Sequence, residues 1–237
     1  MRHAVLLLLF ACISGFAHAQ LNLDKLKKTL KGGGTPTTEE VAAGLKEALT
    51  NGASKGSDLV SKTDGYFKNP EIKIPFPPEV KQVETKLRQI GMGAQVDKFV
   101  LALNRGAEEA AKEAKPIFVS AIKQMTIQDA WNILKGEDDA ATQYLDKTTS
   151  PQLTTKFKPV IQQALEKVSA TKYYADLVNA YNKLPMVTKV NPNLDEYATE
   201  KAIDGLFVMV AKEEKLIRDD PGARSTELLK KVFGAQK

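Results

Sequence analysis

Apolar residues recur every three or four positions along most of this chain, which is the spacing of amphipathic helices. The longest stripe runs from Val96 to Ala114, and its second half is rich in alanine. Thr37 followed by Glu40 is a capping box, and Ser150-Pro151 is a start signal with a capping hydroxyl before a first-turn proline. The pattern predicts helices over 38–49, 57–62, 80–90, 96–114, 117–125, 127–134, 139–145, 151–168, 173–184, 194–218 and 226–233.

One segment breaks the helical pattern. Four prolines exclude a helix over residues 69–78, where Ile72, Ile74 and Phe76 alternate with other residues. We expect this proline-rich arm to be extended, with one apolar edge against the core. The fold class that follows is all-α, a single compact multi-helix domain over residues 38–237. On the helix predicted from residue 173, Tyr173, Leu177 and Tyr181 share one face and should pack into the core.

The first residues resemble export signals. Over residues 1–19, a short apolar run follows Arg2, and Ala17-His18-Ala19 supplies the small residues that signal peptidase needs before Gln20. A weak lipoprotein box ending at Cys12 is an alternative. Either route predicts a periplasmic or secreted protein. Residues 20–37 are expected to form a flexible basic tether, whose few leucines can make at most weak contact with a membrane surface.

Both histidines and the only cysteine lie in the first 19 residues, so the mature chain would hold neither imidazole nor thiol. This excludes Ser-His-Asp and Cys-His catalysis and the usual zinc sites. We therefore expect no cofactor, no transition metal and no enzymatic activity. Without Arg2 the basic residues number 33 against 29 acidic ones, a net charge of +4. An excess this mild gives no support to nucleic-acid binding.

Several stretches together resemble an exported, mainly bacterial helical family known only as a domain of unknown function (DUF4197). The matching stretches are Asp64-Gly65-Tyr66, Ile72-Lys73-Ile74-Pro75, Asn104-Arg105-Gly106-Ala107-Glu108, Met125 to Ala130, Ile133-Leu134-Lys135-Gly136, Asp204-Gly205-Leu206-Phe207, and Ile217-Arg218 through Arg224 to Phe233. The resemblance extends from about Val41 to Gln236. It implies an all-helical fold and a cell-envelope location, and it assigns no catalytic residue. Gly106 stands where that pattern usually has alanine, which would loosen the helix locally.

Glu213 is an unusual carboxylate because its four helical neighbours, Met209, Val210, Leu216 and Ile217, are all apolar. We expect it to be buried and paired with Arg105, Arg224 or Arg88, because an unpaired buried charge is costly. The candidates for ligand binding or structural ion pairs are Asn104, Arg105, Glu108, Glu213, Arg218 and Arg224.

Three functions remain open. The preferred hypothesis is a non-enzymatic envelope protein that binds or scaffolds an unknown component of the envelope. The first alternative is a helical protein that binds a lipid or small apolar ligand, which a large apolar cavity would favour. The second is a histidine-free hydrolase that uses two carboxylates facing each other across an open cleft.

Overall fold

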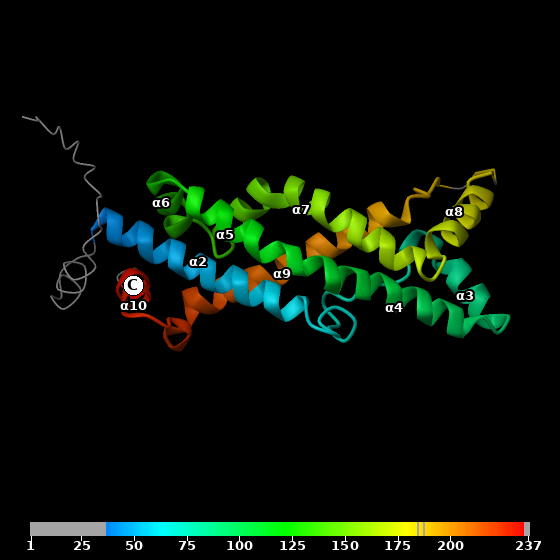
Figure 1. Ribbon diagram of the computed structural model, residues 1–237, viewed down its shortest axis with the longest axis horizontal. Coiled ribbons are helices and arrows are strands. Elements are labelled where there is room, and N and C mark those ends of the chain that lie inside the picture. Colours follow the sequence, from blue (N-terminus) through cyan, green and yellow to red (C-terminus); the bar gives the residue numbers. More distant parts are fainter. Residues whose placement is uncertain (1–36, 184, 187, 235–237) are drawn as a thin grey trace, which may run out of the picture. The chain divides into compact units, whose positions relative to one another are not determined.

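The computed structural model describes residues 37–183, 185–186 and 188–234, and every regular element in these residues is a helix (Figure 1). The described residues belong to one packed unit, so the predicted all-α, single-domain fold is confirmed. The predicted signal peptide and nearly all of the tether lie outside the described residues. In the part of the chain that is described, no helix is long and apolar enough to cross a membrane.

The first described helix, α2 (Thr38–Val60), starts as predicted. The Thr37 side chain accepts from the Glu40 N–H, and the Glu40 carboxylate accepts from the Thr37 N–H. A separate helix over 57–62 was expected, but α2 continues without a break to Val60. Its internal glycines lie at helix contacts instead of ends: a Cβ on Gly56 would lie 3.3 Å from the Cα of Val210. Glycine here lets a neighbouring backbone come close.

The other elements follow in chain order. They are η1 (Pro78–Val80), α3 (Lys81–Gln89), α4 (Gly93–Ala110), η2 (Ala111–Glu113), α5 (Ala114–Gln124), α6 (Ile127–Lys135), α7 (Ala140–Glu166), α8 (Ala170–Tyr181), α9 (Leu194–Asp219), η3 (Pro221–Ala223) and α10 (Glu227–Gly234). Helix α2 packs against α5, α6, α9 and α10, while α7 packs against both α4 and α9. Figure 1 shows α3 and α8 at the opposite end of this unit from α10.

Helix α7 corrects two predictions. Residues 139–145 and 151–168 were expected to form separate helices, with Ser150-Pro151 as a start, yet α7 runs through Pro151 and Pro159. Each internal proline costs about 3 kcal/mol. Both prolines are exposed, whereas the opposite face buries Leu145, Leu153, Phe157, Ile161 and Leu165 completely. Burying each of these side chains contributes roughly 1.5–3 kcal/mol, which is enough to hold the helix together.

Gly106 of α4 lies at the contact with α7. A Cβ there would be 3.1 Å from the Ala164 Cβ and 3.3 Å from the Ile161 Cα. The glycine therefore shortens the distance between the two helices, which is a packing role that its sequence position alone did not indicate.

The arm over residues 69–78 takes the predicted extended form only in its middle, because residues 69–73 make a hydrogen-bonded turn and Pro78 begins η1. After a turn at Asn69 it contains no regular element until η1, and Ile72, Ile74 and Phe76 are buried while Lys73 and Pro75 are exposed. The face expected for α8 is wrong at Tyr173, whereas Tyr181 lies half-buried against the core as predicted. Tyr173 is 70% exposed, and Tyr174 and Val178 are buried in its place. The helix is rotated so that Ala170, Tyr174 and Val178, four residues apart, face the core.

Candidate functional site

Asn104 ties the proline-rich arm to α4. Its side-chain Oδ1 accepts the Ile74 N–H at 2.9 Å, and its Nδ2 donates to the Ile74 carbonyl and the Val100 carbonyl, both at 2.8 Å. The side chain is fully buried. A single amide thus satisfies both backbone groups of Ile74, as a partner strand would.

Arg105, next to Asn104 on α4, and Glu108, one turn further along, hold the turn that precedes the arm. The Arg105 guanidinium contacts Asp64 at 2.7 Å and Glu108 at 2.5 Å. The other oxygen of Glu108 accepts the N–H groups of Tyr66 and Phe67, both at 3.1 Å. Hydrogen bonds from Lys68 and then Arg105 lower the pKa of Asp64. Asp64 has a positive φ of 69°, so these bonds also hold a residue in the sparsely populated left-handed region.

Tyr66 links this turn to α9. Its ring is completely buried, and its hydroxyl donates to the Ala202 carbonyl at 2.5 Å. Burial raises the pKa of Tyr66 far above its usual range, so the hydroxyl remains a donor. Gly205 makes room for the ring: a Cβ on Gly205 would lie only 2.7 Å from the Tyr66 Cε1. The stretches around residues 64–66, 72–75, 104–108 and 204–207 therefore form one structural network.

A second network is centred on Glu214, which is not among the six residues predicted from the sequence. Its Oε1 accepts the Ala141 N–H at 3.0 Å, and its Oε2 accepts the Thr142 N–H and hydroxyl, both at 2.8 Å. Helix α7 starts at Ala140, and the preceding Asp139 makes no side-chain cap. A carboxylate from α9 thus caps the N-terminus of α7, where free N–H groups and the helix dipole favour an anion.

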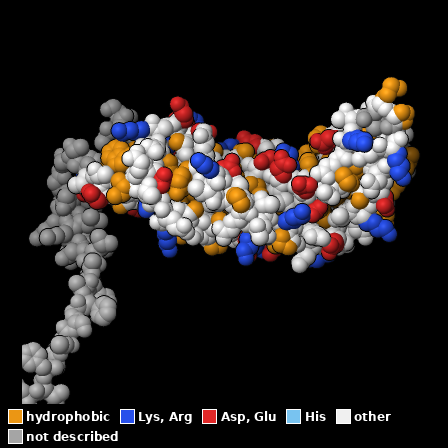
Figure 2. Space-filling model, turned by 90° about the horizontal axis from the view of Figure 1, so that it is seen from above, with side chains coloured by type: hydrophobic (Ala, Val, Ile, Leu, Met, Phe, Trp, Pro, Cys, Tyr) orange, Lys and Arg blue, Asp and Glu red, His pale blue; other side chains and the backbone are white. Residues whose placement is uncertain are grey.

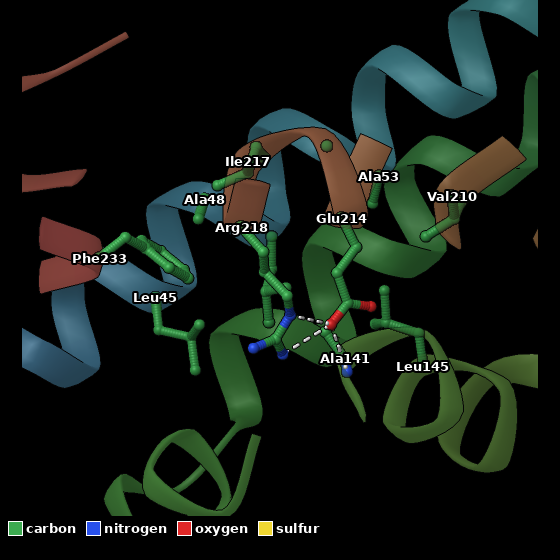
Figure 3. Close-up of a pocket in the computed structure, with 12 residues that line it drawn as sticks. Leu45, Ala48, Ala53, Ala141, Leu145, Val210, Glu214, Ile217, Arg218 and Phe233 are labelled. Atoms are coloured by element: carbon green, nitrogen blue, oxygen red, sulfur yellow. Dashed lines mark hydrogen bonds and ion pairs between the residues drawn. The ribbon is translucent and has the colours of Figure 1, made fainter. Parts of the chain in front are cut away.

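Arg218 completes this network. It donates to Glu214 through Nε at 3.0 Å and through Nη2 at 2.8 Å, and Nη2 also contacts the Ile133 carbonyl in the last turn of α6. Figure 3 shows the pair pointing toward each other among apolar side chains of α2, α7 and α9. The cavity beside it is only about 20 Å³, room for about one water molecule.

Arg224 is buried and serves the end of α9. Its Nε donates to the Ile217 carbonyl at 3.1 Å and its Nη2 to the Arg218 carbonyl at 2.7 Å. Its guanidinium carbon also lies 5.9 Å from the centre of the Phe233 ring. Carbonyls in the last turn of a helix lack helical donors, and a cation there is favoured by the dipole. Arg224 therefore caps the C-terminus of α9.

Glu213 is buried as predicted, but none of the three proposed partners is correct. Its carboxylate pairs at 2.8 Å with Lys55 of α2, whose side chain is 62% exposed. Arg105 and Arg224 belong to the networks above, and Arg88 pairs with Glu84 and Asp97. The error arose because apolar neighbours reveal burial, whereas the packing of α2 on α9 decides which cation lies nearby.

The six candidate residues therefore lie in separate places. Asn104, Arg105 and Glu108 hold the arm and its turn, Arg218 and Arg224 serve helix ends, and Glu213 joins α9 to α2. Each is occupied by a bond within the fold.

An apolar cleft of about 790 Å³ opens between the start of α4 and the junction of α7 with α8. Its inner lining consists of Phe76, Val96, Phe99, Ala170 and Tyr174. All except the half-buried Phe99 are buried. The Phe99 ring lies 4.9 Å from that of Phe76 and 6.4 Å from that of Tyr174. The cleft therefore has an aromatic wall built from the arm, α4 and α8, and its volume is typical of small-molecule sites.

The rim of this apolar cleft carries exposed residues of two kinds. Met92, Val168 and Tyr173 are 38%, 41% and 70% exposed, and Lys98 and Lys167 are the charged members of the lining. Burial raises the pKa of Tyr174 to about 12, with a smaller effect from Glu79, so its ring remains neutral. No sequence pattern marks this site, because Phe76, Phe99 and Tyr174 are ordinary apolar positions until the arm and α8 meet α4.

A polar groove of about 630 Å³ follows the contact of α7 with α9. Its acidic members are Asp146, Glu196, Glu200 and Asp204. Figure 2, seen from the side of α7, shows acidic side chains beside a hollow and hydrophobic ones toward the end where α8 lies. Three of these carboxylates accept side-chain hydrogen bonds. Asp146 accepts from Ser150, Glu196 from Asn191 and Asp204 from Lys201. Among the described residues, no three His, Cys, Asp or Glu side chains are placed to hold a metal.

Comparison with known proteins places the chain in a family. The family described as "Protein of unknown function (DUF4197)" matches residues 35–234. No curated protein and no solved structure matches the chain. The matched range contains the arm, both networks and the apolar cleft. The chain therefore belongs to the DUF4197 family of proteins of unknown function.

Proposed function

We propose that this protein is an exported, non-enzymatic binding protein of the cell envelope, and that it holds a small apolar ligand in the apolar cleft. The observation that carries the proposal is the cleft itself, with about 790 Å³ of space against an aromatic wall. Exposed apolar rim residues such as Tyr173 and Val168 support it, because contiguous exposed apolar surface commonly marks a binding site.

The arrangement of charged groups supports a binding role over a catalytic one. The buried carboxylates Glu108, Glu213 and Glu214 each bond to groups that hold helices or turns in place. A catalytic acid or base must instead reach a reacting atom within about 3 Å. In the apolar cleft, no carboxylate belongs to the lining among the described residues.

Binding of a dye that fluoresces in apolar surroundings, N-phenyl-1-naphthylamine, tests the assignment. The test variant is Met92→Asp, which places a charge on the rim at the N-cap of α4, where an acid is compatible with the helix. The matched control is Ile127→Asp, at the first residue of α6, 48% exposed and away from the apolar cleft.

We expect the parent and Ile127→Asp to bind the dye equally and Met92→Asp to bind it at least about fivefold more weakly, since a charge on the rim must be desolvated. No binding to the parent, or equal binding to all three, would contradict the proposal. The proposed export is tested separately by mass spectrometry. The intact mass of protein recovered from the envelope should correspond to a chain that starts at Gln20.

A further inference from the structure

The charged residues on the rim of the apolar cleft are both lysines. Lys98 comes from α4, and Lys167 follows the last residue of α7. No carboxylate joins them in the lining, and within the described residues the side chain of neither lysine forms an ion pair or a hydrogen bond. Arg88, close by in sequence, differs in that it is paired with Glu84 and Asp97. The apolar cleft therefore offers two free positive charges beside an apolar wall.

Such a combination is complementary to an amphiphile with a negative head group. An alkyl chain gains free energy by leaving water for the surface of Phe76, Phe99 and Tyr174. A head group that stays at the rim keeps its partial hydration and meets lysine ammonium groups on flexible stems. Neutral apolar molecules gain nothing from the lysines, and cationic amphiphiles are repelled by them.

We propose that the natural ligand is a single-chain anionic amphiphile, with its alkyl chain against the aromatic wall and its carboxylate or phosphate head between Lys98 and Lys167. This inference rests on the proposed binding function and adds the class of ligand. The two lysines determine which amphiphile is preferred, while the aromatic wall provides most of the affinity.

Displacement of N-phenyl-1-naphthylamine by three ligands of equal chain length tests the head group: dodecanoate, 1-dodecanol and dodecyltrimethylammonium. The two ionic ligands are kept below their micelle concentrations and dodecanol below its solubility limit. We expect dodecanoate to bind about three- to tenfold more tightly than dodecanol, as two exposed ionic contacts allow, and the cation to bind most weakly. Added salt should reduce the preference. Lauroyl-lysophosphatidylglycerol, which carries a phosphate head group, is compared with dodecanoate to identify the source of the ligand. Displacement of the dye at lower concentration by the lysophospholipid indicates a membrane-derived ligand, and displacement at lower concentration by dodecanoate indicates a free fatty acid.

The double variant Lys98→Gln/Lys167→Gln should bind dodecanoate and dodecanol equally, with each affinity measured by displacement of the dye from that variant. The matched control, Lys147→Gln/Lys156→Gln, removes the same charge from exposed positions on α7 outside the apolar cleft, and it should keep the preference. Equal binding of dodecanoate and dodecanol to the parent, or loss of the preference in the control, overturns the head-group proposal but leaves the binding function intact. Failure of every ligand to displace the dye overturns the binding function itself.

Discussion

The carboxylate of Glu214 accepts two hydrogen bonds from Thr142, one from its backbone N–H and one from its hydroxyl, both at 2.8 Å. The two residues are 72 positions apart in the sequence. Through this contact α9 supplies the cap that α7 lacks at its own N-terminus. The same carboxylate holds Arg218, which extends the connection to the last turn of α6.

Glu214→Ala should lower the free energy of unfolding by about 3–5 kcal/mol, because it leaves the Arg218 guanidinium, 11% exposed, without its carboxylate and two N–H groups without an acceptor. Chemical denaturation measures the loss. Glu227→Ala, which breaks an exposed pair with Lys230, is the control and should cost less than about 1 kcal/mol. Similar midpoints for the two variants would refute the capping role.

Asn104→Ala should destabilise the domain by about 2–5 kcal/mol. The substitution leaves the buried N–H and carbonyl of Ile74 without partners, at about 1–3 kcal/mol for each group. The control is Asn132→Ala on the exposed face of α6, where the side chain bonds only to Gln128, and it should change stability by at most about 0.5 kcal/mol. Hydrogen exchange at the Ile74 amide provides a local measurement, and protection that persists in Asn104→Ala would contradict the assignment.

Glu213→Ala should cost only about 1 kcal/mol, less than the roughly 3 kcal/mol expected for a fully buried ion pair. Its partner Lys55 is 62% exposed, so the ammonium is rehydrated when the carboxylate is removed. Thermal or chemical unfolding of Glu213→Ala alongside Lys55→Ala tests this. A loss of 3 kcal/mol or more for Glu213→Ala would show that the carboxylate has a stronger role than this pair indicates.

Acid should weaken the start of α2 through Glu40. A hydrogen bond from Lys231 and then one from the Thr37 N–H lower the pKa of Glu40 below its usual value of 4.5. The folded state thus binds this proton less readily than the unfolded state. The ionised Glu40 carboxylate therefore stabilises the folded state fully above the pKa of the unfolded chain. This stabilisation is lost as the pH falls through the lowered pKa of the folded state. Glu40→Gln should lose less free energy of unfolding between pH 6 and pH 3 than the parent protein does. Glu39→Gln, a variant of the exposed neighbour, should lose nearly as much as the parent.

The sequence predicts local features well because they depend on neighbouring residues. Residues within a few positions set the capping box at Thr37, the alternating burial of Ile72, Ile74 and Phe76 in the arm, and the burial of Glu213. Each of these features is present in the structure. The long helix α7 was missed because Pro151 is a strong local signal that the buried stripe on the opposite face outweighs.

Features that depend on helix packing could not be obtained in this way. Glu214 and Arg218 are four residues apart on α9 and resemble an ordinary surface pair in sequence. Only the approach of the α7 N-terminus gives Glu214 its role. The apolar cleft has the same origin, since its wall joins Phe76 of the arm, Phe99 of α4 and Tyr174 of α8.

The cap that Glu214 provides has a consequence for the order in which the chain can fold. Helix α2 at the start of the domain packs on α9 and α10 at its end, and α7 obtains its N-terminal cap from α9. A chain interrupted before Leu194 therefore lacks the part of the α2 covering that α9 and α10 supply, and it lacks the acceptor at the start of α7. We expect a growing chain to stay incompletely packed until its last helices have been made.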